Sequence, residues 1–370
     1  MPLRSWILFL LVVTTLLSII HGFILFHLWP LIGDGPIRWI TLASFVFLGT
    51  AYMIGRLLES RTPRLALPFL HIGSWWLGIM SYLFLGCFLL DLLFILSSLV
   101  PFLPVDLLPW MQSYFITLCV VVLSAMAAGH YNVLYPRVRE LPIKAPGGLR
   151  IIVASDLHLC GLVSIRRVER IVNTIQSLKA DLILLPGDTI DEDMTQSPRS
   201  HPFREALKKL QAPLGVIAVT GNHEWICGVN ATTSWLKSCG IRVLQDEVID
   251  LGPIYVAGRN DAASVRINGQ QPIPLEKILE GVKQHKPLMV LDHQPTRISE
   301  AVEAGVDLLL CGHTHHGQFW PFQWITKKVF AISHGHKRIG STDIYVSCGA
   351  GAWGPQVRTS SRSEILLINP

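Results

Sequence analysis

The first 135 residues contain no lysine and only nine ionised side chains, five arginines and four acids. All of the lysines and most of the other charges lie in the rest of the 370-residue chain. This uneven distribution implies two regions of different physical character. Because the positive mean hydropathy and the 50% hydrophobic content come mostly from the first region, we expect a membrane region followed by a water-soluble domain.

The seven cysteines never occur in a C-x-x-C pair. The sequence therefore indicates neither a disulfide framework nor a zinc site made of thiolates. The net charge of +5 is small for this length, and the basic residues are scattered rather than gathered in a patch. Charge thus gives no indication of nucleic-acid binding.

Four long stretches of the first region lack ionised side chains, and a spanning helix needs roughly 20 apolar residues. We predict a transmembrane region over residues 1–135 with four helices near 6–28, 38–57, 67–90 and 111–131. The third apolar stretch continues to Val100. Two shorter segments broken around Gly86 to Asp91, and hence five spans, are the alternative.

The basic residues predict the orientation of these spans. In the four-span arrangement only Arg38 falls on one side of the membrane. The basic residues on the other side are Arg4, Arg56, Arg61, Arg64, Arg137, Arg139 and Lys144. The positive-inside rule then predicts a multi-pass protein of the bacterial inner membrane with a cytoplasmic soluble domain. A cleaved signal peptide is the competing interpretation of the first span, but no A-x-A site follows it.

A linker containing proline and glycine is expected over residues 136–148, and the pattern of residues 149–370 is that of an α/β domain. Short β-branched runs predict strands at Leu149–Ala154, Asp181–Leu185, Gly215–Thr220, Ile254–Ala257, Leu288–Leu291, Val306–Leu310, Ile344–Ser347 and Glu364–Ile368. Amphipathic segments predict helices at Ile165–Leu178, Phe203–Leu210, Thr232–Ser238 and Thr296–Glu303.

Polar clusters follow five of these strands. They are Asp156-Leu157-His158, Gly187-Asp188, Gly221-Asn222-His223-Glu224, His293 and Gly312-His313-Thr314-His315. The carboxyl ends of strands in an open α/β sheet converge on one crevice. Carboxylate, imidazole and amide oxygen ligands suit Mn, Fe, Zn or Co, and Asp188 is the candidate to bridge two ions about 3.5–4 Å apart.

Each cluster by itself has an ordinary explanation, such as a capping turn for Asp156-Leu157-His158 or a hydrogen-bonded core residue for His293. The ordered set of five favours a metal site instead. In this set the sequence resembles the calcineurin-like metallophosphoesterase superfamily, whose D-x-H, G-D, G-N-H-[DE], H and G-H-x-H pattern is matched in order. Gly317-Gln318, the segment 346–349, Arg358 and the apolar first region look most like its membrane-anchored bacterial branch of YkuE and YaeI type.

The resemblance implies a four-layer αββα sandwich of two sheets with helices outside. It also implies two divalent metal ions. One would be held by Asp156, His158, Asp188 and His315, and the other by Asp188, Asn222, His293 and His313. A hydroxide shared by the ions would attack phosphorus, with His223 as the catalytic group that protonates the leaving oxygen and Glu224 supporting it by orienting the imidazole.

Several polar residues stay outside this set. His316 is expected to touch substrate or solvent rather than metal. His334 and His336, which have no acidic neighbour in the sequence, are expected in a solvated basic loop. Arg358 is expected to have a structural or substrate-binding role.

The sequence thus predicts a membrane-anchored phosphoesterase that cleaves a phosphoester or pyrophosphate bond. The apolar region favours membrane lipids as partners and a lipid-linked substrate. Two alternatives remain open: a metal- or phosphate-binding sensor or transporter component without turnover, and a nuclease of the same superfamily.

Overall fold

The computed structural model describes residues 3–59, 61–99, 110–282 and 285–370. The chain forms two compact units that divide between Ala128 and Gly129. The division falls inside a helix that ends at Leu134, so that the last turns of this helix belong to the second unit.

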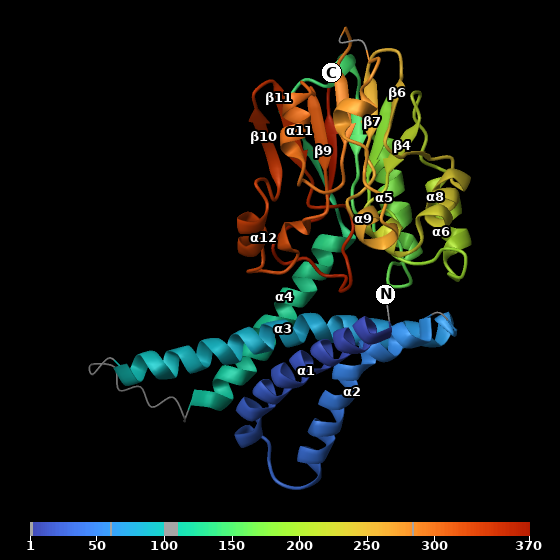
Figure 1. The fold of residues 1–370 in the computed structure, drawn as a ribbon. Helices are drawn as coiled ribbons and strands as arrows, with labels where there is room; N and C mark the ends of the chain where they lie inside the picture. The colour runs from blue at the N-terminus through green and yellow to red at the C-terminus, as the bar shows by residue number, and fades with distance from the viewer. Residues whose placement is uncertain (1–2, 60, 100–109, 283–284) are drawn as a thin grey trace. The chain divides into compact units, whose positions relative to one another are not determined.

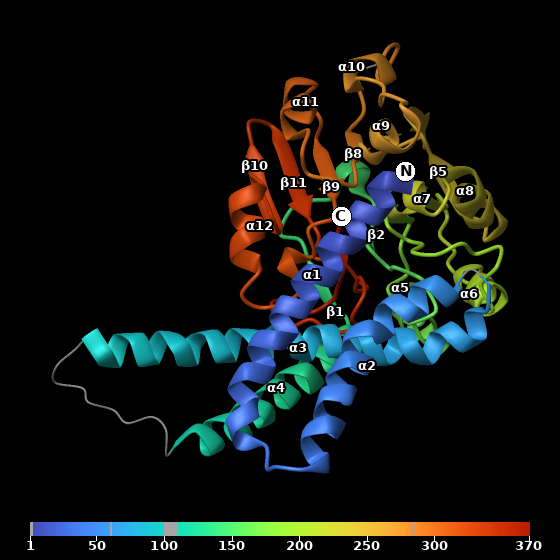
Figure 2. The ribbon, with the colours of Figure 1, turned by 60° about the horizontal axis from the view of Figure 1, so that its bottom comes forward.

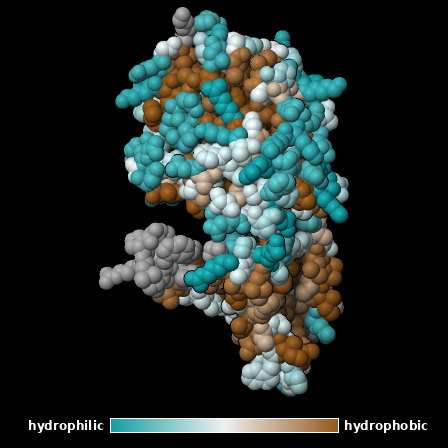
Figure 3. Space-filling view, turned by 90° about the vertical axis from the view of Figure 1, so that its right-hand side faces the viewer, coloured by the Kyte–Doolittle hydropathy of each residue, from teal (hydrophilic) through white to brown (hydrophobic). Residues whose placement is uncertain are grey.

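Four long helices make up the first unit among the described residues (Figure 1). They are α1 (Leu3–Leu28), α2 (Pro36–Glu59), α3 (Pro63–Leu99) and α4 (Met111–Leu134). By length and composition, each is able to cross a membrane. Because α3 runs without a break through Gly86–Asp91, the alternative with two shorter segments is wrong. On the face shown in Figure 3, hydrophobic side chains dominate the helical unit, and polar ones dominate the second unit.

The second unit contains two six-stranded sheets. The order in the first sheet is β1 (Arg137–Glu140), β12 (Glu364–Ile368), β2 (Ile151–Val153), β3 (Leu182–Pro186), β4 (Val216–Val219) and β5 (Arg242–Leu244). The order in the second is β10 (Gly335–Ile339), β11 (Thr342–Val346), β9 (Leu308–Cys311), β8 (Leu288–Leu291), β7 (Tyr255–Gly258) and β6 (Glu247–Asp250). Strands β2 to β5 run parallel to one another, as do β7, β8, β9 and β11.

The main hydrophobic core lies between the two sheets. Alternate residues of a strand point to the same face, so Leu182 and Leu184 of β3 share this core with Met289 and Leu291 of β8. The described helices outside the sheets are α5 (Ile165–Ser177), α6 (Ser200–Leu207), α7 (Asn222–Ile226), α8 (Val229–Ser238), α9 (Ala263–Asn268), α10 (Leu275–Ile278), α11 (Ile298–Glu303) and α12 (Gln323–Val329). The expected four-layer αββα sandwich is confirmed.

Four strands were not expected from the sequence, and all four are edge strands. They are β1, β5, β6 and β10. Strand β1 lies in the segment expected to be a linker and pairs in parallel with β12. The segment expected to be a solvated loop around His336 is strand β10, which pairs with β11. Both expectations were wrong because edge strands carry charged side chains instead of a hydrophobic pattern.

Candidate metal centre

Nine site residues were predicted. All of them except Glu224 lie at the carboxyl ends of strands, where their side chains come together. Asp156 and His158 follow β2, Asp188 follows β3, and Asn222 and His223 open helix α7 after β4. The second sheet contributes His293 after β8, and His313 and His315 after β9. Since both sheets carry parallel strands whose carboxyl ends meet here, residues distant in sequence converge on one crevice.

The backbone is strained at this crevice. Asp156, His158, Asp188, His313 and His315 all have a φ between 47° and 73°. Residues other than glycine rarely adopt such left-handed conformations, and clusters of them are typical of functional sites. The tight turns point five side chains from different strands toward the same volume.

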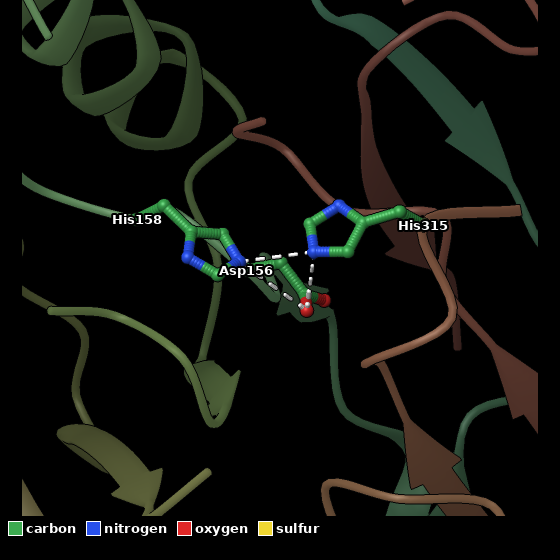
Figure 4. Close-up of side chains that lie close together, drawn as sticks. All are labelled: Asp156, His158 and His315. Atoms are coloured by element: carbon green, nitrogen blue, oxygen red, sulfur yellow. Dashed lines mark hydrogen bonds and ion pairs between the residues drawn. The ribbon is translucent and has the colours of Figure 1, made fainter. Parts of the chain in front are cut away.

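The first group of possible ligands consists of Asp156, His158 and His315 (Figure 4). The Nε2 atoms of the two imidazoles lie 2.9 Å apart. Asp156 Oδ1 lies 3.5 Å from Nε2 of His315 and 3.9 Å from Nε2 of His158. Three ligand atoms thus converge from three directions, as coordination of one ion requires.

The second group consists of Asp188, His293 and His313. Asn222 joins it, since its Oδ1 lies 2.9 Å from Nδ1 of His313. Asp188 Oδ2 lies 3.0 Å from Nε2 of His293 and 3.8 Å from Nε2 of His158. One carboxylate therefore faces ligands of both groups.

Two buried atoms of these groups test whether a metal fits. Asp156 Oδ2 and His293 Nε2 are inaccessible to solvent and form no hydrogen bond within the described part of the chain, although Asp188 Oδ2 lies 3.0 Å from His293 Nε2. The other ring nitrogen of His293, Nδ1, lies 2.8 Å from the Pro186 carbonyl oxygen, which fixes the proton on Nδ1 and leaves Nε2 as a potential ligand. Buried polar atoms without a partner are costly, and a cation bound here would satisfy both.

The lowered pKa values of two of the histidines, His313 and His315, suit metal binding, which requires neutral imidazole. Burial, together with the neighbouring His293, lowers the pKa of His313 to about 3. Burial and His158 lower the pKa of His315 as well. For Asp188, burial would raise the pKa, but the adjacent His293 holds it well below its usual range. The carboxylate is therefore ionised at neutral pH.

His223 has a carboxylate partner that sequence reasoning missed. Its Nδ1 forms a hydrogen bond with Asp191, and Asp191 Oδ2 also lies 3.5 Å from Nδ1 of His158. Burial alone would lower the pKa of His223, but the hydrogen bond and charge of Asp191 raise it to about 9. Asp191 lies only three residues beyond Asp188 in Gly187-Asp188-Thr189-Ile190-Asp191, so its place in this motif was the available signal.

The expectation that Glu224 orients His223 was wrong. Its buried carboxylate accepts hydrogen bonds from the backbone N–H groups of Asp188, Thr189, Ile190 and Gly221. Glu224 therefore links the turn that contains Asp188 to the start of helix α7.

The basic residues outside the ligand groups also have defined contacts. Arg358 is fully buried and contacts His315. The rings of His316 and His334 lie 4.9 Å apart. His334 Nε2 lies 3.3 Å from Glu364, and His336 Nε2 lies 2.7 Å from Asp343. His336 on β10 and His334 just before it thus both have acidic partners. Their neighbours in the sequence do not reveal these partners.

Comparisons with known proteins point to one family. The family described as calcineurin-like phosphoesterase matches residues 149–317. An uncharacterized metallophosphoesterase of Helicobacter pylori is 34% identical over 238 residues, which cover 63% of each chain. An uncharacterized metallophosphoesterase of Aquifex aeolicus is 31% identical over 250 residues, which cover 65% of this chain and 94% of that protein.

A third relative is named as a transmembrane protein. The zebrafish (Danio rerio) protein called "Transmembrane protein with metallophosphoesterase domain" is 32% identical over 62% of this chain and 55% of its own length. This chain therefore spans about 63% of the Helicobacter relative and less of the zebrafish one. The similarity and the ligand groups show that the chain belongs to the calcineurin-like metallophosphoesterase family.

Proposed function

We propose that this protein is a dinuclear-metal phosphoesterase that hydrolyses a phosphoester or pyrophosphate bond in a lipid-linked substrate. The position of Asp188 between the two ligand groups supports the dinuclear centre most directly. Asp156, His158, Asp188 and His315 would hold one ion. Asp188, Asn222, His293 and His313 would hold the other. Bound divalent ions, Mn, Fe, Zn or Co, would activate water and neutralise phosphoryl charge.

The protein's own residues would supply a proton to the leaving oxygen. His223 is the candidate because the pKa of about 9 keeps its imidazole protonated at neutral pH. Its Nε2 lies 4.0 Å from Asp188 Oδ2, so it faces the bridging carboxylate. Asp191 holds the ring from the Nδ1 side. His223 would therefore donate from Nε2 as a general acid, and Asp191 would stabilise its charged form.

The membrane region supports a substrate that gathers at the bilayer. Four helices are long and apolar enough to cross a membrane, so the second unit is tethered beside it. The distribution of Arg56, Arg61, Arg64, Arg137 and Arg139 supports a cytoplasmic domain in a bacterial inner membrane. Phospholipids and lipid-linked nucleotides or sugars are then the substrate classes at the highest local concentration.

A hydrolysis screen of the full chain tests this proposal. The detergent-solubilised protein, stripped with EDTA and reloaded with Mn²⁺, is assayed on artificial mono- and diesters, phospholipids, lipid-linked pyrophosphates and DNA. We expect Asp188→Asn to abolish turnover and to lower the bound metal from two ions per chain. Asp250→Asn is the matched control, because Asp250, the last residue of β6, is exposed and pairs with Lys286.

Each other result of the screen points to a different function. Metal binding without turnover of any substrate would contradict the phosphoesterase and support a sensor. Turnover confined to DNA would replace the lipid-linked substrate with a nucleic acid. One ion per chain in the active wild-type protein would contradict the dinuclear centre.

A further inference from the structure

An exposed apolar patch surrounds helix α12. We define the α12 patch as Trp320, Phe322, Trp324, Ile325 and Val329. Each of these side chains is between 44% and 67% exposed. The rings of Trp320 and Trp324 lie 5.8 Å apart, so that the patch is contiguous there. Gathered exposed apolar side chains mark an interaction surface, whereas scattered ones do not.

The α12 patch is fixed to the candidate metal centre. Helix α12 follows the short helix η4 (His315–Gly317), which contains the predicted ligand His315. Gly317 has a φ of 74°, and a Cβ there would collide with the backbone of Gln323, the first residue of α12. Only glycine permits this close approach. The patch and the ligand loop therefore form one packed element, which lies beside β10 and β11 in Figures 1 and 2.

The same patch adjoins the end of the last apolar helix. Trp320 N donates to Thr359 Oγ1 at 2.9 Å. A Cβ at Gly129, in the last turns of α4, would come within 2.9 Å of Thr359 Cγ2. One residue, Thr359, therefore connects the α12 patch in space to the point where this helix joins the second unit. The exposed aromatic residues Tyr131 and Tyr135 follow Gly129, and such residues gather where helices leave a bilayer.

The charges beside the patch fit one particular surface. Lys327 and Lys328 are exposed on α12, and the helix contains no acidic residue. Tryptophan and phenylalanine with adjacent lysines are typical of segments that lie in the interface of an anionic membrane.

We propose that the α12 patch docks into the headgroup region of the membrane that α4 enters, with Lys327 and Lys328 facing anionic lipid. Since η4 and α12 pack closely against each other, docking holds the ligand loop at the bilayer surface. This consequence rests on the proposed function, because a lipid-linked substrate would then enter from the membrane side. The docking itself does not depend on which bond is cleaved.

A fluorescent probe on the full chain tests the docking without using activity. The exposed Cys119 and the partly exposed Cys227 are replaced by serine, and Ile325→Cys is labelled with the environment-sensitive dye NBD. The control is Ile273→Cys, because Ile273 is similarly exposed but precedes α10, which lies apart from α12 in Figure 2. Both proteins are reconstituted in vesicles containing phosphatidylglycerol, with or without shallow doxyl-labelled lipid.

We expect doxyl lipid to quench the Ile325→Cys probe at least twofold and to leave the Ile273→Cys probe unchanged. Adding Lys327→Glu and Lys328→Glu should reduce the quenching in these anionic vesicles. Equal quenching at both positions, or quenching at neither, would overturn the proposal. So would a blue-shifted Ile325→Cys probe that doxyl lipid does not quench, because that result would assign the patch to a second copy or another protein.

A second measurement separates this inference from the proposed function. Trp324→Ser with Ile325→Ser should raise KM for a vesicle-borne substrate severalfold and leave kcat/KM for a soluble artificial diester unchanged. Failure of the proposed function would remove activity on both substrates in the wild type but leave the probe result intact. An equal loss on both substrates in the variant would contradict a docking role.

Discussion

Arg358 holds His315 at two points: Nη1 donates to its backbone carbonyl oxygen at 3.1 Å, and Nη2 donates to its ring Nδ1 at 2.7 Å. Arg358 is itself fixed by the end of α4, because its N–H donates to the Gly129 carbonyl oxygen and its own carbonyl accepts from Asn132. A predicted metal ligand is thus positioned by a buried guanidinium and, through it, by the last turns of an apolar helix.

Arg358→Lys tests this positioning. Lysine keeps the charge but cannot make the two-point contact, so we expect metal affinity to fall roughly 10- to 100-fold, the usual cost of losing a group that orients a ligand. The measurement is titration of the EDTA-treated full chain with Mn²⁺ by calorimetry. Arg362→Lys is the control, since Arg362 lies on the same segment but contacts Tyr135. Equal affinity in both variants, with unchanged thermal stability, would contradict the positioning role.

Asp191→Asn should shift the pH dependence of activity. Asp191 raises the pKa of His223 to about 9, so removing its charge lowers that pKa. A general acid is lost as the pH rises through its pKa. The basic limb of the kcat profile should therefore move to lower pH by about one unit or more. Asp193→Asn, two residues away and bonded to Thr195, should leave the limb in place. An unmoved limb in Asp191→Asn would remove His223 as the acid.

Glu364→Gln should reduce stability at neutral pH but not in strong acid. Burial would raise the pKa of Glu364, but hydrogen bonds with His334, Cys348 and Tyr345 bring it down to about 2. A depressed carboxyl pKa stabilises the folded state above the unfolded pKa, and this contribution is lost as the pH falls toward 2. At neutral pH it amounts to about 3 kcal/mol.

Thermal unfolding in detergent between pH 7 and pH 2.5 measures this effect. The difference in Tm between wild type and Glu364→Gln should be roughly 10 °C at pH 7 and should shrink below pH 4. Glu247→Gln, on the exposed edge strand β6, serves as the control and should show no such trend. A Tm difference that is constant with pH would mean that the glutamine disturbs packing rather than charge.

The accuracy of the predicted strands depends on their place in the sheets. The eight expected strands are the interior ones, such as β3, whose five residues are all buried and apolar. The four missed strands are the edges, such as β1 with the sequence Arg137-Val138-Arg139-Glu140. An edge strand is held by backbone pairing with its neighbour, which no side-chain periodicity records. The sequence could therefore indicate the core of the sandwich but not its borders.

The metal ligands of the candidate site, like the interior strands, could be predicted from the sequence. The order of Asp156, His158, Asp188, Asn222, His223, His293, His313 and His315 in the chain predicts a metal centre, because each cluster follows a buried strand and parallel strands bring their ends together. The composition of the first 135 residues likewise predicts the apolar helices, since only long uncharged runs can cross a bilayer.

Only the tertiary structure determined which groups contact and orient these site residues. The choice of Asp191 over Glu224 as the partner of His223 depends on how the turn after β3 faces helix α7. The contact between Arg358 and His315, 43 residues apart in sequence, and the exposure of α12 beside Thr359 depend on how distant segments pack. Hydrogen bonds and burial of this kind arise from folding in three dimensions, so local sequence patterns do not contain them.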